Sequence, residues 1–308
     1  THFGVGSDGA TNGNGQTYVA YLFADNSSED ADDQMIKCGS YTGNGSATGP
    51  VVNLGWEPQF VLIRNASDGG NWLIMDSMRG IPTGDESSVL APNSNAAESS
   101  LANLWGINLT ATGFQINVTQ SQINASGQTY IYMAIRAPMM VEPEAATDVF
   151  KPTLGQAASN ISVGFPLDMA IIATTSGDSG HDVVTRLQGE KTHLRTSSTA
   201  AETADNGHWN MDSMDTFYQD QMGGTKINYF WKRAKGFFDV MAYEGNYSAN
   251  PQMLHNLGVA PEMLIARSRD AVGQWYIKHT GMAANREIYF NSNASSLGGS
   301  WTTTNTYW

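Results

Sequence analysis

The sequence of this chain is repetitive, and the repeat limits the possible folds more than any other feature. Asn53–Gly55, Pro58 and Trp72 recur as Asn256–Gly258, Pro261 and Trp275, at a constant offset of 203. In both copies the proline follows the glycine by three residues, and the tryptophan follows the proline by fourteen. A chain with such a period is built from similar units, so the unit has to be identified before the fold.

The two ends of the chain supply the parts of one further unit. The first copy continues to Gly127–Ile131, and the segment that matches it, Gly15–Val19, lies near the N-terminus. If the N-terminus is numbered as following the C-terminus, Tyr18 has an offset of 196 from Tyr130. We therefore expect closing strands of a split unit in residues 1–28, a complete repeat in 34–138, a divergent repeat in 139–236 and the opening part of the split unit in 237–308.

Composition favours an all-β fold. The chain has 32 glycines in 308 residues, and only 15% of its residues are charged. Long runs of Glu, Lys, Leu and Ala, which are typical of helices, are absent from the sequence. The sequence therefore predicts tandem antiparallel β-sandwiches, jelly-roll or lectin-like, in repeats of about 100 residues.

The apolar pattern and the turn residues place the strands. In the complete repeat we expect strands at 36–41, 51–54, 59–64, 71–76, 113–117 and 128–137, with a hairpin joining 60–63 to 72–75. In the divergent repeat, an apolar strand at 169–172 and a closing strand at 229–234 keep the same order. Tyr18–Ala24 is an apolar strand suited to the middle of a sheet, and residues 26–33 form a polar, acidic linker.

Charge and cysteine content exclude several function classes. The net charge is −13, from 16 basic and 29 acidic side chains, and such a surface repels nucleic acids. No apolar run is long enough for a membrane span.

Cys38 is the single cysteine, so no intrachain disulfide forms, and we interpret it as a small apolar residue buried in a strand. The sequence contains no Walker or Rossmann motif, and we expect no cofactor.

The sequence offers no convincing catalytic or metal-binding set. Residues 177–180 read Gly-Asp-Ser-Gly, as in trypsin-like serine proteases, but the remainder of that motif is missing, so a turn is the better interpretation. His181 and His193 are close in sequence, but scattered surface histidines explain them better than a two-histidine site. Asp76 and Asp212 both precede Ser-Met, yet the repeat puts His279 near the place of Asp76, which argues against a catalytic carboxylate.

Three tryptophans are the candidate binding residues. Trp105, Trp209 and Trp301 lie among polar residues, and an exposed indole face can stack on a sugar ring. They mark a possible glycan site, with packing at the edge of a core as the alternative.

The repeated motifs resemble a known group of proteins. Tyr41–Asn44, then Asn53–Glu57 with its apolar strand, then Gly127–Tyr130, together with Asn228–Val240, resemble repeats of tail-fibre and tail-associated virion proteins of marine tailed phages, cyanophages among them. The resemblance covers most of the chain and is weak over 173–224. It implies a non-enzymatic structural protein on the virion surface, outside the cell, with a role in host-surface attachment and no catalytic residues.

Two alternative functions also fit the sequence. A lectin-like carbohydrate-binding module or an extracellular filament subunit is the second interpretation, and a polysaccharide depolymerase is the third. The expected partners are further copies of the chain or other virion proteins, and host surface glycans. The split unit can be closed by residues 1–24 of the same chain, or by those of a neighbouring chain as in donor-strand complementation.

Overall fold

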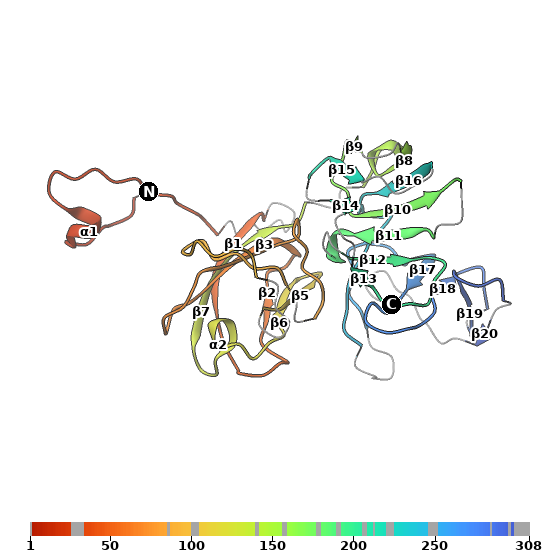
Figure 1. Ribbon diagram of the computed structural model, residues 1–308. Coiled ribbons are helices and arrows are strands. Elements are labelled where there is room, and N and C mark those ends of the chain that lie inside the picture. The colour runs from red at the N-terminus through yellow and green to blue at the C-terminus, as the bar shows by residue number, and fades with distance from the viewer. Residues whose placement is uncertain are drawn as a thin grey trace.

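The computed structural model shows a protein made of antiparallel sheets (Figure 1). The structure describes residues 2–25, 34–84, 87–99, 105–138, 142–155, 159–176, 180–188, 192–204, 208–211, 213–219, 225–245, 252–283, 285–294 and 297–298. Its strands are joined by turns and loops, and the helices in these ranges are single short turns. The expectation of an all-β fold with antiparallel sheets is confirmed. No helix in the described part of the chain has the length and apolar character needed to cross a membrane.

Residues 36–136 form two sheets around one core. The first sheet has the order β1 (Ile36–Thr42), β7 (Thr129–Arg136), β3 (Pro58–Asn65), β4 (Leu73–Asp76), and the second has the order β2 (Val51–Asn53), β6 (Gly113–Ile116), β5 (Ile107–Thr110). A helical turn, α2 (Ser121–Asn124), precedes β7. The strands expected from the sequence lie within a residue or two of these bounds, and β3 and β4 pair as the expected hairpin.

Alternating apolar residues explain why these strands face one another. In β3, Val61 and Ile63 are fully buried, while their neighbours along the strand are half-buried. Phe114 of β6 meets Tyr132 of β7 edge to face, with ring centroids 5.7 Å apart, so the two sheets share one core. Gly55, in the turn before β3, has a φ of +86°, a conformation that glycine adopts without strain.

Residues 150–231 form a second pair of sheets with the same central order. The larger sheet runs β13 (Thr203–Ala204), β12 (Thr192–Arg195), β11 (Asp182–Thr185), β10 (Met169–Thr174), β16 (Lys226–Trp231), β8 (Phe150–Gly155). The smaller runs β14 (Trp209–Asn210), β15 (Thr216–Gln219), β9 (Ser159–Ser162), and two 3-10 turns, η2 (Ala146–Asp148) and η3 (Arg186–Gln188), lie between strands. The run β11-β10-β16-β8 matches β4-β3-β7-β1, and β16 is the closing strand expected for this region.

The C-terminal region adds one four-stranded sheet. Its order is β17 (Met263–Ala266), β18 (Tyr276–His279), β19 (Arg286–Tyr289), β20 (Leu297–Gly298). Trp275, just before β18, packs against Val183 of β11 and Leu194 of β12. The sheet is therefore anchored on the middle region through an apolar contact.

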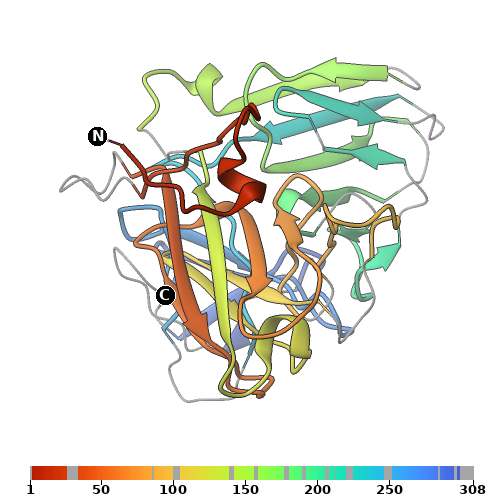
Figure 2. The ribbon, with the colours of Figure 1, turned by 90° about the vertical axis from the view of Figure 1, so that its left-hand side faces the viewer.

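The N-terminal segment differs from its expected structure. Residues 2–25 contain one helical turn, α1 (Gly9–Asn12), and no strand, so the strand predicted at Tyr18–Ala24 is not formed. Figures 1 and 2 place the segment on the side of the molecule formed by residues 34–138, reaching away from the body. The physical reason is that a strand exists only when it pairs with a neighbour, and this segment has no neighbouring strand in the described structure.

Cys38 also differs from its expected environment. It lies in β1 as predicted, but its side chain is exposed instead of buried. Partial burial, with a smaller effect of Asp25, raises the pKa of its thiol and so disfavours the reactive thiolate.

Candidate functional site

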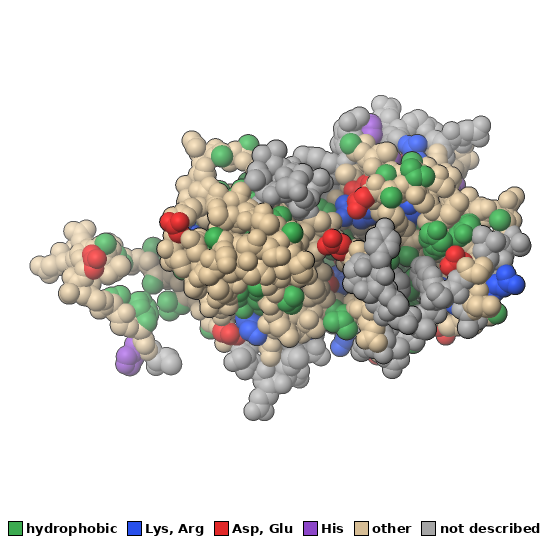
Figure 3. All heavy atoms as spheres, turned by 90° about the horizontal axis from the view of Figure 1, so that it is seen from below, with side chains coloured by type: hydrophobic (Ala, Val, Ile, Leu, Met, Phe, Trp, Pro, Cys, Tyr) green, Lys and Arg blue, Asp and Glu red, His purple; other side chains and the backbone are tan. Residues whose placement is uncertain are grey.

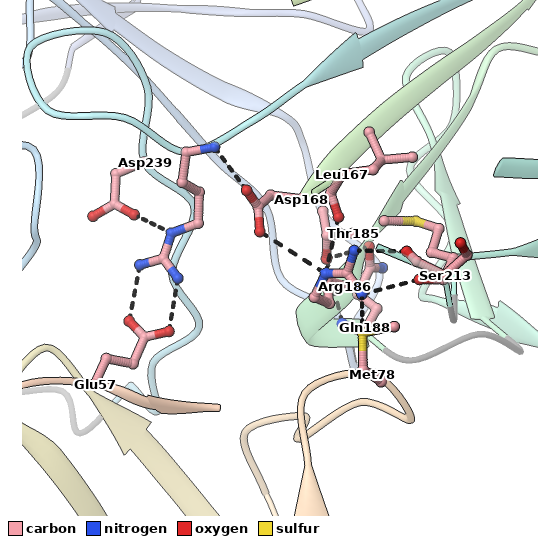
Figure 4. A network of polar contacts seen from close by, with 11 residues as sticks. Glu57, Met78, Leu167, Asp168, Thr185, Arg186, Gln188, Ser213 and Asp239 are labelled. Atoms are coloured by element: carbon pink, nitrogen blue, oxygen red, sulfur yellow. Dashed lines mark hydrogen bonds and ion pairs between the residues drawn. The ribbon is translucent and has the colours of Figure 1, made fainter. Parts of the chain in front are cut away.

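A cluster of charged side chains joins the three sheet-forming regions at one point. Arg233, which follows β16, donates from Nη1 and Nη2 to the two carboxylate oxygens of Glu57 at 2.7 and 2.8 Å. Its Nε donates to Asp239 at 2.7 Å, and its backbone N–H donates to Asp168 at 2.7 Å (Figure 4). Asn256 donates from Nδ2 to Glu57, so the C-terminal region shares the same carboxylate.

Arg186 extends this cluster within the middle region. It begins η3, and its Nε donates to the carbonyl of Leu167 at 2.9 Å while its Nη1 donates to the carbonyl of Met211 at 3.0 Å. The carboxylate of Asp168 lies 3.9 Å from Nε, and the sulfur of Met78 from the first region lies 2.8 Å from Nη1 (Figure 4). The two arginines therefore hold neighbouring regions together through side-chain and backbone acceptors.

Burial and neighbouring charges shift the pKa values of Arg233 and Asp168. Burial alone would lower the pKa of Arg233, but the charges of Glu57 and Asp239 raise it well above the ordinary value. Burial raises the pKa of Asp168, against the opposing charge of Arg233. Because the arginines donate to the carboxylates, the arrangement neutralises buried charge and positions the backbone of Arg233.

The space beside the cluster is small. A cavity of about 50 Å³ is lined by Glu57, Met78, Asp168, Arg186 and Arg233, among others. That volume holds a few water molecules and is too small for a sugar ring. Sequence reasoning did not single out these residues as a site. The available signal was a charged residue directly after an apolar strand, in Lys232-Arg233, and that pattern alone does not identify its partners.

The tryptophans predicted as glycan-stacking residues lie inside the protein where they are described. Trp105 is 8% exposed and belongs to the first core, with its indole N–H donating to Ser99 at 3.0 Å. Trp209 is 3% exposed and stacks on Phe217 in the second core. Neither ring face is open to a sugar in this arrangement, and the structure does not bring the two rings together. Trp301 lies outside the described residues.

The remaining sequence candidates are not assembled into a site. The side chain of His193 is buried, with Nε2 3.6 Å from Asp182 and 3.3 Å from Thr203, whereas His181 is exposed. Asp76 pairs with Arg79. Most of the Gly-Asp-Ser-Gly tetrapeptide (177–179), Asp212 and the acidic linker at 26–33 lie outside the described residues. Among the residues that are described, no three His, Cys, Asp or Glu side chains are grouped as metal ligands.

The N-terminal segment is the second candidate, as a binding surface. Its large apolar side chains are exposed, with Val19 at 75%, Tyr21 at 80% and Phe23 at 61%. Figure 3 shows hydrophobic side chains along this segment, where it reaches out from the body. A run of exposed apolar residues of this kind marks a surface that binds another protein or promotes association.

The N-terminal segment has the same local hydrogen bonds as the residues before β7. The hydroxyl of Tyr18 donates to the carbonyl of Gly9 and accepts from the N–H of Gly13. At an offset of 112, the hydroxyl of Tyr130 donates to Ser121 and accepts from Ala125.

The same offset relates three further features. At this offset α1 corresponds to α2, and Gly15 (φ +76°) corresponds to Gly127 (φ +77°). The hydrogen bond from the Asn12 side chain to the carbonyl of Gly6 likewise corresponds to the hydrogen bond from the Asn124 side chain to the carbonyl of Val118. The segment therefore has the same local conformation as residues 118–130, without the sheets that surround them.

Comparison with known proteins gives one family. A family model described as "Domain of unknown function (DUF7483)" matches residues 1–138 and 232–307, which together make up more than half of the chain. No curated protein and no solved structure matches the chain. The matched ranges include the N-terminal segment and the C-terminal sheet, and they leave out most of the middle region.

Proposed function

The chain belongs to this family, the domain of unknown function DUF7483, and we propose that it is a non-enzymatic structural subunit of a virion surface appendage. In this role it assembles with further copies of itself or with other virion proteins. It acts outside the cell, at the host surface. The resemblance of its repeated motifs to tail-fibre and tail-associated proteins of marine phages supports this proposal.

The observation that carries the proposal is the exposed apolar segment at residues 16–24. An isolated soluble protein gains nothing from exposing Val19, Tyr21 and Phe23 together, because burying each such side chain is worth about 1.5–3 kcal/mol. In an assembly, the same side chains supply the contact between subunits. Short apolar segments and open sheet edges are the means by which β-proteins join into larger structures.

The charged cluster supports the same role. Arg233 forms buried ion pairs with Glu57 of the first region and with Asp239, and its backbone N–H donates to Asp168 of the middle region, so buried polar contacts join the regions. The cluster uses its carboxylates for this purpose, which favours a structural role over hydrolysis of a polysaccharide.

The first test is the solution mass of the purified chain by size-exclusion chromatography with light scattering. We expect ordered multimers for the full chain and monomers after deletion of residues 2–24. Negative-stain electron microscopy of the multimers should show filaments or rings of uniform width. A full-length chain that stays monomeric at high concentration, alone and with neighbouring virion proteins, would argue against the proposal. Binding of the multimer to host cells tests the attachment role separately.

A further inference from the structure

We propose that the open edge of β17 in one copy of this protein receives residues 17–24 of a second copy as an additional antiparallel strand. The inference rests on the proposed function as an assembling subunit, and it specifies the two surfaces that meet. It follows from three observations: an edge without a strand, a matching loss of pairing beside it, and a segment of the right sequence that is exposed.

The first observation is the edge of β17. At the offset of 203, residues 263–266 correspond to residues 60–63 of β3, and β18 corresponds to β4. Strand β3 pairs with β4 on one side and with β7 on the other. Within the described residues, β17 pairs with β18 and with no second strand, and Met263 and Ile265 are 50% and 45% exposed. The N–H and C=O groups along such an edge are available to a further strand.

The second observation concerns residues 239–245. The match of Tyr243 to Tyr41, at an offset of 202, places residues 239–244 on Lys37–Thr42 of β1. In the first region, β1 pairs only with β7 among the described strands. In the C-terminal region, residues 239–245 form no strand. In the described structure, both β17 and residues 239–245 lack a strand between them, in the position that β7 occupies between β3 and β1. Its absence therefore explains both the bare edge of β17 and the missing counterpart of β1.

The third observation is that residues 17–24 match β7 at the offset of 112. If residues 17–24 pair with β17 as β7 pairs with β3, Ala20 lies opposite Ala266, because the corresponding residues Tyr132 and Ile63 lie opposite each other. It also places Leu22 opposite Leu264, in the register of Ala134 and Val61.

These pairs direct the side chains to the correct faces. Val61, Ile63, Tyr132 and Ala134 all face the first core, so Ala20 and Leu22 would face inward with Leu264 and Ala266. Tyr21 and Phe23 would then cover Ile265 and Met263 on the other face. The exposed apolar side chains of the segment and of the edge are thus removed from water together.

Tyr18 supplies a further point of fit. In the first region, Tyr130 stacks on Tyr41 of β1 with ring centroids 5.1 Å apart. The corresponding residues, Tyr18 and Tyr243, are both exposed. Insertion of the segment between β17 and residues 239–245 brings these two rings into the same stacked arrangement.

The donor is a second copy because of where the segment lies. Figure 1 shows residues 2–25 and the sheet β17–β20 at opposite ends of the molecule. The helical turn and the Tyr18 hydrogen bonds are already formed in the free segment, so less conformational entropy is lost when it docks. A donor at one end and an acceptor at the other give head-to-tail contacts, which build a filament or a ring.

Disulfide trapping tests this contact directly. Two variants are prepared, both with Cys38→Ser, one carrying Ala20→Cys and the other Ala266→Cys. Residues directly opposite in a ladder lie within the Cα separation that a disulfide needs. After mixing and mild oxidation, we expect loss of monomer and gain of a dimer on a non-reducing gel. Mass spectrometry should identify the crosslink as one between the peptide that contains position 20 and the peptide that contains position 266.

The matched control is Val19→Cys in place of Ala20→Cys, in the same Cys38→Ser background. The side chain at position 19 points to the other face of the strand, so this variant should give little dimer.

Each outcome is decisive. Multimers that disappear on deletion of residues 2–24 but give no crosslink between positions 20 and 266 would overturn the assignment to β17 and leave the proposed function in place. A chain carrying both cysteines that crosslinks only within itself, as a monomer, would show that the segment closes its own sheet and would overturn the second-copy donor. The absence of both multimers and crosslinks would count against the inference and the proposed function together.

Discussion

At the scale of single residues, a cluster of buried charges is the main polar feature that the described interior offers. The side chain of Arg233 is 11% exposed and donates to the carboxylates of Glu57 and Asp239, while its backbone N–H donates to the carboxylate of Asp168. Breaking such a cluster costs much more than its formation contributes, because the remaining charges stay buried without a partner.

Arg233→Met is therefore expected to destabilise the protein by about 3–5 kcal/mol. The change leaves the carboxylates of Glu57 and Asp239 without their cation and keeps the side-chain volume similar. Urea unfolding followed by tryptophan fluorescence measures the effect. Arg286→Gln, at an exposed position of β19 where solvent screens the contacts of the guanidinium, is the control and should change stability by less than about 1 kcal/mol. Equal losses in the two variants would contradict the role given to the cluster.

Glu202 gives a pH-dependent prediction. Burial alone would raise its pKa, but the hydrogen bonds and charge of Arg269, at 2.6 and 3.1 Å, hold the pKa below the ordinary value of 4.5. A lowered folded pKa contributes stability that is present above the unfolded value and is lost as the pH falls through the folded value.

We expect Glu202→Gln to cost about 2 kcal/mol at pH 7, and the gap between wild type and variant to shrink once the pH falls below about 4.5. Unfolding midpoints at pH 7, 5, 4 and 3 measure this gap. Asp168, whose raised pKa has the opposite effect on stability, is present in both proteins and cancels in the difference. A gap that stays constant with pH would show that Glu202 acts through packing alone.

At the scale of elements, strands were predictable where their partners lie in the same region. The apolar alternation and turn residues of 34–138 placed β1, β3, β4 and β7 to within a residue or two. The same pattern in Tyr18–Ala24 predicted a strand that is not formed, because a ladder depends on a partner that the sequence of one strand cannot supply. The pattern shows that the segment is able to pair as a strand, and among the described residues it has no strand partner.

Tyr21→Pro tests the segment as an element. Proline removes a backbone N–H from the ladder and is excluded from central strands, so it should abolish multimers. Because Tyr21 is exposed and reaches away from the body, the thermal unfolding midpoint of the body should be unchanged. Light scattering and circular dichroism measure the two effects. Ser7→Pro, ahead of α1 and outside the matched strand, is the control and should leave assembly intact; multimers that persist in Tyr21→Pro would exclude a strand at residues 17–24.

At the scale of the whole molecule, the candidate sites were harder to predict than the fold. Trp105 and Trp209 stand among polar residues in sequence, yet each is buried, because burial is decided by the opposite sheet and not by sequence neighbours. Glu57 and Arg233 are 176 residues apart and meet through the packing of two regions. Contacts of this range depend on how the regions dock, and no local pattern carries that information.

The distribution of apolar cores predicts which parts fold alone. Among the described residues, the core of the first region lies between Tyr41 and Ala134, whereas Trp275 of the C-terminal region is buried against Val183 and Leu194 of the middle region. We expect a fragment of residues 34–138 to unfold cooperatively on heating, with the far-ultraviolet circular dichroism of a β-protein.

A fragment of residues 237–308 should show neither property alone, since it lacks both the surface that buries Trp275 and the strand that completes β17. If it folds by itself, its sheet does not depend on the middle region.

A peptide of residues 14–25 should raise the unfolding midpoint of the full chain lacking residues 2–24, and the same peptide with Tyr21→Pro should not. That difference would show that the stabilisation comes from binding at a strand edge. The gain should grow with peptide concentration, because a ligand that binds only the folded protein stabilises it by mass action.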